Sequence, residues 1–342
     1  MMAVMKTKPG PGAELRHVEI PRPGPDDVLV KVLATSICGT DLHIYEWNEW
    51  AQKRIKNLPQ IMGHELCGEV VELGRNVKNI KTGDIISAET HIACGHCYLC
   101  HTGNAHICIN GKIFGVDIHG VFAEYALVPA NNVWILDKRI PKDFASVMEP
   151  LGNAVHTVLA GEITGTTVLV TGCGPIGLMS TLVSHLCGAT KVITTEINDY
   201  RIGLAKKIGA DVVLNPKKDK VVERVLAETD GLGVDVVLEM SGNPQAIQEA
   251  FDAIRPGGRY SILGIPEIPM EIDLGKIVFK YITIQGINGR LIFSTWHQTS
   301  RFLSSGRLNI EPIITHRFKL EEFEEGMKLM KSGTCGKILL YP

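Results

Sequence analysis

Residues Thr167-Val-Leu-Val-Thr-Gly-Cys-Gly-Pro-Ile-Gly177 are the most informative about the fold, because they join a strand-like run to a glycine-rich turn and the start of a helix. The turn has the spacing Gly172-x-Gly174-x-x-Gly177, which is typical of dinucleotide-binding folds when a strand and a helix flank it. Gly172 permits a tight turn, Gly174 lets a pyrophosphate approach the backbone, and Gly177 lets helix and strand pack closely. The motif alone is a weak signal, because a glycine-rich turn also occurs in other α/β proteins.

Strand and helix patterns alternate on the carboxyl side of this stretch. Three more runs have strand character: 191–196, 234–239 and 259–264. Helices are expected through Leu186 and from about 200 to 208. Strands interleaved with helices imply βαβ units and a parallel sheet. We therefore expect a doubly wound, Rossmann-type α/β domain over residues 151–290.

The amino-terminal part has a different pattern, with short apolar runs separated by Pro, Gly and Asp. Residues 28–33 and 67–74 are examples, and both predict strands. Helices containing Trp296 and Met330 follow the second domain and are expected to return to the first. The sequence thus predicts a mostly-β, barrel-like domain made of residues 1–150 and 291–342.

Composition limits the classes of function. A length of 342 residues favours two domains, and 45% hydrophobic with 21% charged residues is typical of globular proteins. A net charge of −2 argues against a nucleic-acid partner, and no apolar run approaches the roughly 20 residues that span a bilayer. The nine cysteines are odd in number and no secretion signal is visible, so we expect reduced thiols and a cytoplasmic location.

Glu196 strengthens the cofactor prediction. It lies 19 residues beyond Gly177, at the end of the next predicted strand, where a carboxylate binds the ribose hydroxyls of NAD. The same carboxylate would repel a 2′-phosphate, so NAD is favoured over NADP. Arg201 could accept that phosphate, but with Glu196 in place we assign it to packing on the adenosine part of NAD.

Four cysteines occur within fifteen residues, at Cys94, Cys97, Cys100 and Cys108. Four thiolates fill the tetrahedral coordination of zinc and leave no open position, so this site is expected to be structural. The competing interpretation is a zinc-ribbon module that binds nucleic acid or protein. It lacks basic residues around the loop and leaves the other motifs unexplained.

A second metal site is indicated by Cys38 and by His64 in the triplet Gly63-His64-Glu65. Zinc prefers thiolate and imidazole ligands, and a catalytic site keeps one position open. Glu65 and Glu149 are alternative candidates for the third ligand. Together with the nucleotide loop, this site predicts metal-assisted oxidation of an alcohol by a nicotinamide cofactor.

The motif Gly63-His-Glu-x2-Gly-x5-Gly74-x2-Val77, with Cys38-Gly-Thr-Asp41 and the cysteine loop, resembles the medium-chain, zinc-dependent alcohol and polyol dehydrogenases over essentially the whole chain. A carboxylate at Glu149, where simple alcohol dehydrogenases have cysteine, points to the polyol and amino-alcohol branch. Residues 38–50, 149–157 and 312–318 are similar to the members that oxidise L-threonine. The resemblance implies a GroES-like catalytic domain, one catalytic and one structural zinc per chain, and a homotetramer.

The resemblance also implies roles for individual residues. Thr40 would take the proton of the substrate hydroxyl, and His43 would relay it to solvent, since imidazole exchanges protons near neutral pH. Asp41 would orient His64. Glu149 would ligate zinc directly or through water, or else be a solvated carboxylate at a helix start.

The expected substrate is L-threonine, oxidised to 2-amino-3-ketobutyrate; the alternative is 2,3-butanediol or a polyol of the sorbitol type. Threonine also needs its charged groups recognised, and Arg290 and His91 are candidates, each with a packing role as the alternative. Trp47 and Trp50 could line the pocket or serve packing. Further cofactor contacts are expected at Ile176, Leu263, Gly264, Ile265, Ile287 and Asn288; at Asn288 related enzymes often have Tyr.

Overall fold

The computed structural model describes all 342 residues and divides into two compact units. The first unit comprises Met1–Glu149, Leu291–Ser305 and Ile314–Pro342, and the second comprises Pro150–Arg290 and Gly306–Ile313. The sequence placed all of 291–342 in the first domain. Gly306–Ile313 instead joins the second unit because its 3₁₀ turn packs against two helices there, α6 and α7. None of the helices has the length and apolar character needed to cross a bilayer.

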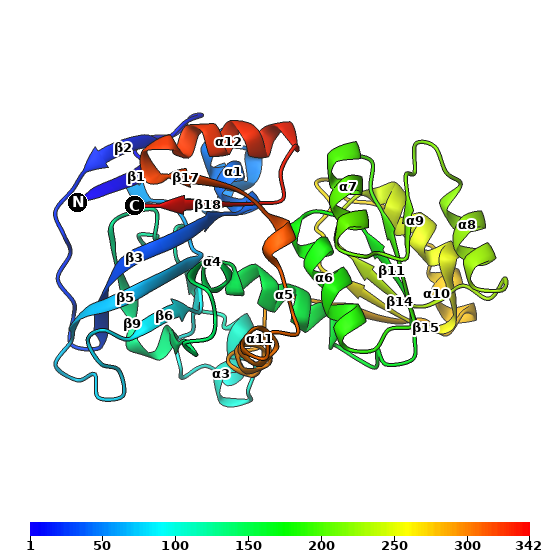
Figure 1. Cartoon of the computed structure of the whole chain (residues 1–342), viewed down its shortest axis with the longest axis horizontal. Helices are drawn as coiled ribbons and strands as arrows, with labels where there is room; N and C mark the ends of the chain where they lie inside the picture. The colour runs from blue at the N-terminus through cyan, green and yellow to red at the C-terminus, as the bar shows by residue number, and fades with distance from the viewer. The chain divides into compact units, whose positions relative to one another are not determined.

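The first unit is built mainly from antiparallel strands. Its largest sheet has the order β10-β6-β5-β3-β18-β17, with β9 paired to β3 (Figure 1). These strands are β3 (Asp27–Ile37), β5 (Leu66–Leu73), β6 (Ile85–Ala88), β9 (Tyr125–Pro129), β10 (Val133–Ile135), β17 (Ile314–Lys319) and β18 (Lys337–Tyr341). Smaller sheets contain β1 (Met2–Lys6), β2 (Glu14–His17) and β4 (Gln60–Ile61), and β7 (His91–Ile92) with β8 (Lys112–Ile113). The predicted strands at 28–33 and 67–74 are confirmed.

Alternation along β3 forms the core of this sheet. Val28, Val30 and Val32 point to one face and are buried together with Leu66 and Val70 of the neighbouring strand. Side chains two residues apart share a face of a strand, so this run buries one continuous apolar row. The apolar row fixes the pairing register of β3 with β5, because a slip of one residue would turn it toward the opposite face.

Six helices complete the first unit: α1 (Gly39–Glu46), α2 (Glu49–Arg54), α3 (Tyr98–His101), α4 (Lys142–Ser146), α11 (Ser294–Ser304) and α12 (Phe323–Ser332). Helix α12 buries Phe323, Gly326 and Met327, a spacing that places three residues on one helical face. It packs beside α1, as Figure 1 shows. The helices predicted around Trp296 and Met330 are confirmed as α11 and α12.

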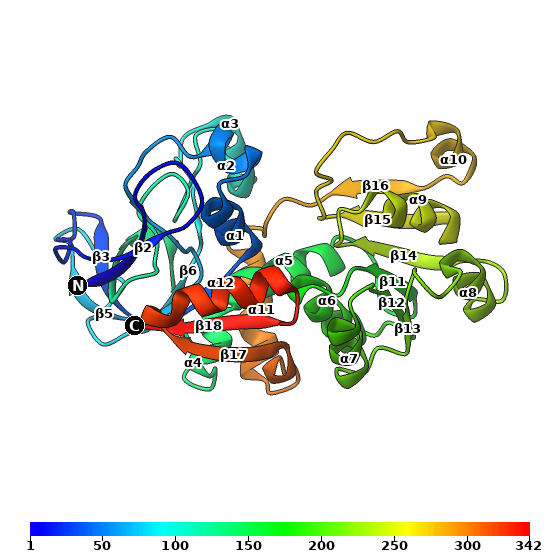
Figure 2. The same cartoon turned by 90° about the horizontal axis from the view of Figure 1, so that it is seen from above.

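The second unit has a six-stranded parallel sheet with the order β13-β12-β11-β14-β15-β16 (Figure 2). Its strands are β11 (Thr167–Thr171), β12 (Lys191–Thr195), β13 (Val212–Leu214), β14 (Val234–Glu239), β15 (Ile254–Ile262) and β16 (Thr283–Gly286). The helices are α6 (Pro175–Leu186), α7 (Asp199–Lys207), α8 (Val221–Glu228), α9 (Pro244–Ala253) and α10 (Leu274–Phe279). Helix α5 (Met148–Val158) also belongs mostly to this unit, although it begins two residues before the unit's first residue, Pro150. This confirms the predicted doubly wound α/β fold.

Strand order in this sheet reverses at β11. The chain runs outward from β11 through β12 to β13, and then returns to β14 on the other side of β11. Ligands of doubly wound sheets bind at such a switch point, outside the carboxyl ends of the strands. The glycine loop Gly172–Gly177 directly follows β11 and therefore lies at this position.

Candidate functional site

Two neighbouring strand ends bring the predicted metal ligands together in the first unit. Cys38 directly follows β3, Glu65 directly precedes β5, and these two strands pair through Thr35 and Leu66. Cys38 is the N-cap residue of helix α1, and its backbone N–H donates to Asp41 Oδ2 at 2.9 Å. This cap fixes the first turn of the helix and with it the position of the cysteine.

Cys38, His64 and Glu65 offer ligand atoms that all lie within 4.8 Å of one another. One thiolate, one imidazole and one carboxylate form a donor set that suits a zinc ion with an open position. His64 Nδ1 and Asp41 Oδ1 are buried without a hydrogen-bond partner, and they lie 3.7 Å apart. Asp41 is thus placed to accept a hydrogen bond from a ligating imidazole, as the sequence predicts. These residues fit a zinc ion.

Anionic groups dominate the surroundings of His64. Burial opposes its protonation, but the charges of Asp41 and Cys38 outweigh burial and raise the pKa of His64 well above its usual value. A site that attracts a proton this strongly also attracts a metal cation, which would replace the proton on the imidazole. Glu149, on α5, is buried but does not belong to the three-ligand group. Burial is the main cause that raises the pKa of Glu65, and the charge of Glu149 raises it further.

The two predicted relay residues lie on α1. Thr40 is half-buried, with its hydroxyl oxygen 3.9 Å from Cys38 Sγ. His43 is one turn further along and exposed, with Nδ1 2.8 Å from the amide nitrogen of Asn48. The helix therefore leads from the metal ligands to the surface. Trp50 is exposed and its ring lies 6.2 Å from that of His43, whereas Trp47 is half-buried.

His91 is held by a buried acid that the sequence analysis missed. Glu89 Oε1 accepts the backbone N–H of His91 at 2.7 Å and lies 3.2 Å from the imidazole Nδ1. The indole N–H of Trp296 donates to the other oxygen of Glu89 at 2.6 Å. The signal for Glu89 would have been an acidic residue inside an otherwise strand-like run, two positions before a histidine.

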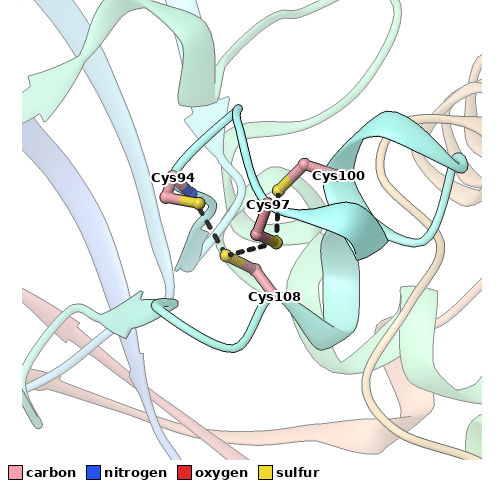
Figure 3. Close-up of side chains that lie close together, drawn as sticks. All are labelled: Cys94, Cys97, Cys100 and Cys108. Carbon is pink, nitrogen blue, oxygen red and sulfur yellow. Dashed lines mark hydrogen bonds between the residues drawn. The ribbon is translucent and has the colours of Figure 1, made fainter.

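The four cysteines of the 94–108 loop converge as predicted. Their sulfur atoms point toward one another (Figure 3), with Cys97 Sγ 3.5 Å from Cys100 Sγ and 3.8 Å from Cys108 Sγ. A backbone N–H at His96 lowers the pKa of the Cys94 thiol to about 6, while burial raises that of Cys100 to about 11. Four converging thiols fit a structural zinc site, which would take all four as thiolates.

The glycine loop of the second unit has the geometry that phosphate binding requires. Gly172 has a φ of 86°, and a side chain on Gly177 would collide with the carbonyl of Gly172. Gly174 caps α6 and has open space around its Cα, so a phosphate group can approach its backbone and the helix N-terminus. Glu196 Oε2 accepts the backbone N–H of Cys173 at 2.9 Å, which ties the acid to the loop.

A pocket of about 490 Å³ adjoins this loop. Of the predicted cofactor residues, it is lined by Gly172, Gly174, Glu196 and Arg201. Lys217, Ser241 and Asn243 also line it and were not predicted, because isolated polar residues after a strand carry no motif. Ile176, Gly177, Leu263, Gly264, Ile265, Ile287 and Asn288 are not among its lining residues. Gly264 packs instead against Glu239 and Gly242, at the carboxyl end of β14.

Arg290 is fully buried in the second unit. Its guanidinium donates to the side-chain oxygen of Asn153 at 3.1 Å, and its aliphatic part packs on Gly152. His91 lies in the first unit, so the two predicted substrate residues come from different units. The buried position of Arg290 requires that any carboxylate it binds be desolvated as well.

A dinucleotide pocket in one unit and a cluster of zinc ligands in the other define an oxidoreductase that uses NAD(P) and zinc. Residues 24–138 match the model of the alcohol dehydrogenase GroES-like domain, and residues 175–305 match that of the zinc-binding dehydrogenases. The chain belongs to the zinc-binding dehydrogenase family. This confirms the family, the GroES-like and Rossmann fold class, and the enzyme class predicted from the sequence.

Relatives are similar over their whole length. An L-threonine 3-dehydrogenase of Pyrococcus horikoshii is 57% identical over 99% of this chain and 98% of its own, and one of Bacillus subtilis is 50% identical over 100% and 99%. Among solved structures, a zinc-binding dehydrogenase of Sinorhizobium meliloti bound to NADP is 32% identical, with a TM-score of 0.92 over 100% of this chain and 99% of its own. The 2R,3R-butanediol dehydrogenase of Bacillus subtilis is 29% identical, with a TM-score of 0.90 over 100% and 99%.

Proposed function

We propose that this enzyme oxidises L-threonine to 2-amino-3-ketobutyrate with NAD. The observation that carries the proposal is 50–57% identity, over nearly the whole chain, to relatives named L-threonine 3-dehydrogenase. The juxtaposition of Cys38, His64 and Glu65 supports the chemistry. Oxidation of 2,3-butanediol is the second candidate, favoured by the likeness to the butanediol dehydrogenase, but that similarity is only 29%.

Zinc, when bound by Cys38, His64 and a carboxylate, would act as a Lewis acid on the substrate's secondary hydroxyl. Thr40, beside the cysteine, accepts the substrate's hydroxyl proton while its own hydroxyl proton passes on to His43. His43 lies further along the same helix, at the surface, and releases a proton to solvent in turn. Asp41 holds the imidazole of His64 in orientation, and Glu149 either ligates the metal or tunes the charge around it. We assign one catalytic and one structural zinc to each chain.

The cofactor assignment rests on Glu196. Its carboxylate lines the pocket beside Gly172 and Gly174, where the ribose of a dinucleotide on this loop would lie. The hydride acceptor is the nicotinamide, whose chemistry belongs to the cofactor. Arg201 and Lys217 line the same pocket, so its preference for NAD over NADP depends on the negative charge of Glu196.

The candidates for binding the amino-acid head of the substrate are Arg290 and His91. Arg290 would pair with the carboxylate, because a guanidinium binds carboxylates with two parallel hydrogen bonds. His91, held by Glu89, is the other candidate, because its imidazole offers a polar group for the head. Removing the charge of Arg290 is expected to weaken threonine binding, typically by about 2–5 kcal/mol for a buried contact.

A substrate panel tests this function. The purified enzyme with NAD should turn over L-threonine much faster than 2,3-butanediol or sorbitol, which present a hydroxyl without the amino-acid head. L-Serine and L-allo-threonine are the matched controls, because they keep the head and change the carbon that is oxidised. Preference for butanediol or sorbitol would refute the threonine assignment while leaving zinc and hydride transfer in place.

We further propose that the enzyme is a cytoplasmic homotetramer. Reduced thiols at the four-cysteine site suit the cytoplasm. In the second unit, β16 is an edge strand whose four residues are all exposed, and large apolar side chains surround it, including Phe279 (92% exposed) and Tyr281 (86%). Figure 2 shows β16 at the edge of its sheet. Such a surface is typical of a protein interface.

Light scattering measures this assembly directly. The wild type should have the mass of four chains, and a Phe279→Lys, Tyr281→Lys variant should give a smaller mass. Tyr98→Lys is the control, because Tyr98 is also exposed but lies in the cysteine loop of the other unit. A monomeric wild type would contradict the proposal.

A further inference from the structure

Lys337 is a buried lysine that no step of the proposed reaction uses. Its side chain is 3% exposed and its partner Glu65 is fully buried. The ammonium lies 2.7 Å from Oε1 and 2.6 Å from Oε2 of Glu65, and it donates to the carbonyl of Ile37 at 2.9 Å. The hydroxyl of Ser36 also donates to Oε2. Both oxygens of Glu65 are therefore held by groups other than a metal.

Strand pairing places this lysine behind the candidate zinc site. Lys337 is the first residue of β18, and its neighbour Ile338 pairs with Ile37 at the end of β3. Cys38 follows Ile37 directly, so the lysine comes from the strand next to the one that ends at the cysteine. The backbone pairing already fixes β18, and an apolar residue at 337 could fill the same space. The positive charge thus needs an explanation beyond packing.

The explanation lies in the charges that meet at this point. Charged and polar groups from four segments meet here. Cys38 and Asp41 come from the start of α1, and His64 and Glu65 from the segment before β5. Helix α5 contributes Glu149, and β18 contributes Lys337. A zinc ion held by Cys38 and His64 would compete with the ammonium for the same carboxylate. An ammonium next to a dication also repels it, and the repulsion is strong where water is excluded.

We propose that Lys337 is a positioning residue that restrains Glu65, and that this restraint and the charge of its ammonium together weaken metal binding at the Cys38–His64 site. This rests on the zinc site of the proposed function. With the lysine present, Glu65 offers the metal only part of its charge. A restrained carboxylate leaves the metal more electron-poor, which suits a Lewis acid, at the expense of affinity.

Four proteins form the test: wild type, Lys337→Met, Glu65→Gln, and the double variant. Lys337→Met leaves an unrestrained carboxylate and should bind zinc more tightly, by a factor on the order of 10. Glu65→Gln leaves the ammonium facing the metal and should bind more weakly by a similar factor. The double variant carries neither charge and should lie between Glu65→Gln and the wild type, because removing the lysine then relieves the repulsion but no restraint on a carboxylate. A lysine that only supports the fold would instead lower affinity, or leave it unchanged, whenever it is removed.

The measurement is zinc retained per chain in full-length protein titrated with a chelator. Cys38→Ser provides the background, because only its four-cysteine site should retain metal. The affinity order Lys337→Met, wild type, double variant, Glu65→Gln supports the proposal, with a smaller gain from removing the lysine when position 65 is glutamine. The proposal is overturned if Lys337→Met retains zinc no better than the wild type, while the wild type retains more zinc than Cys38→Ser. That outcome leaves the proposed function intact.

Two further comparisons keep the result decisive. Without metal, Lys337→Met contains a buried carboxylate that has lost its ammonium partner. If this variant is isolated only with zinc bound, Glu65→Gln and the double variant carry the test. With glutamine at position 65, removing the lysine must still tighten zinc binding, or the proposal is wrong. If the wild type retains no more zinc than Cys38→Ser, the catalytic zinc itself is absent and the proposed function fails with it.

Discussion

The indole N–H of Trp296 donates to Glu89 at 2.6 Å, although the two residues are 207 positions apart in the chain. Trp296 is 1% exposed and Glu89 fully buried. Because Glu89 also accepts the backbone N–H of His91, helix α11 fixes the position of that histidine through one carboxylate. Asn132 completes the arrangement by donating to the carbonyls of Glu89 and His91.

Loss of this hydrogen bond should impair substrate binding as well as stability. Trp296→Phe removes a hydrogen bond from a buried oxygen of Glu89, which typically costs about 1–3 kcal/mol. If Glu89 acts by orienting His91, Glu89→Gln should raise KM for L-threonine more than it lowers kcat. Steady-state kinetics and urea unfolding measure the two effects separately.

A double-mutant cycle with His91→Asn distinguishes orientation from a general loss of structure. Adding Glu89→Gln to His91→Asn should raise KM little further, since the histidine being oriented is already absent. Additive effects on KM would show that Glu89 acts without His91.

Replacing Glu196 should relax the choice of cofactor. Glu196→Ser removes the charge that repels a 2′-phosphate, and Arg201 and Lys217 remain in the pocket to attract one. We expect the ratio of kcat/KM for NAD to that for NADP to fall about tenfold or more, equivalent to about 1.4 kcal/mol. Asp199→Asn is the matched control, because this exposed acid pairs with Lys218 and does not line the pocket. A wild type that prefers NADP would contradict the assignment.

The two cysteine sites should respond differently to serine. Cys38→Ser removes a ligand from an open site and should abolish turnover with a modest loss of stability. Cys100→Ser should loosen the 94–108 loop, in which Cys97 is the one buried cysteine, because the loop has little apolar core to hold it without metal. Activity, zinc content and proteolysis within the loop compare the two variants. Full activity in Cys38→Ser would contradict the catalytic role.

Motifs made the zinc and nucleotide sites predictable, because their residues have fixed spacing along the chain. Cys38, His64 and Glu65 are joined by one strand pairing, and the glycine loop follows its own strand. Lys337 could not be predicted, since it reaches Glu65 from 272 positions away through the register of β18. A lone lysine in an apolar carboxyl-terminal strand carries no signal of its partner.

The boundary near Gly306 was missed for a related reason. Its turn joins the second unit through packing against α6 and α7, which no local pattern encodes. Trp296 and Glu89 likewise lacked a signal, because each has an ordinary apolar or acidic role until the fold places them together. Polar contacts between residues far apart in the chain could therefore not be predicted from the sequence.

Lys6 should make the stability of the protein depend on alkaline pH. Lys6 is 1% exposed. Its ammonium donates to the carbonyls of Gly10 and Gly12, lies 3.4 Å from the carbonyl of Tyr45, and sits 5.1 Å from the centre of the Trp47 ring. These contacts hold the carboxyl end of α1, the helix that carries Thr40 and His43. Burial lowers the pKa of Lys6 from 10.5 to about 8.

The sign of the effect follows from proton binding. Between pH 8 and 10.5 the unfolded chain keeps the lysine proton and the folded protein has lost it, so unfolding takes up a proton. The free energy of unfolding contributed by this group therefore increases with pH in that window, by at most about 1.4 kcal/mol per pH unit, and falls again as pH drops toward 8. Urea unfolding at several pH values should show the wild type gaining stability over Lys6→Met from pH 8 upward. Lys6→Arg stays protonated and should show no such gain relative to Lys6→Met; a wild type that parallels Lys6→Arg would show that the ammonium of Lys6 keeps its proton in the folded protein.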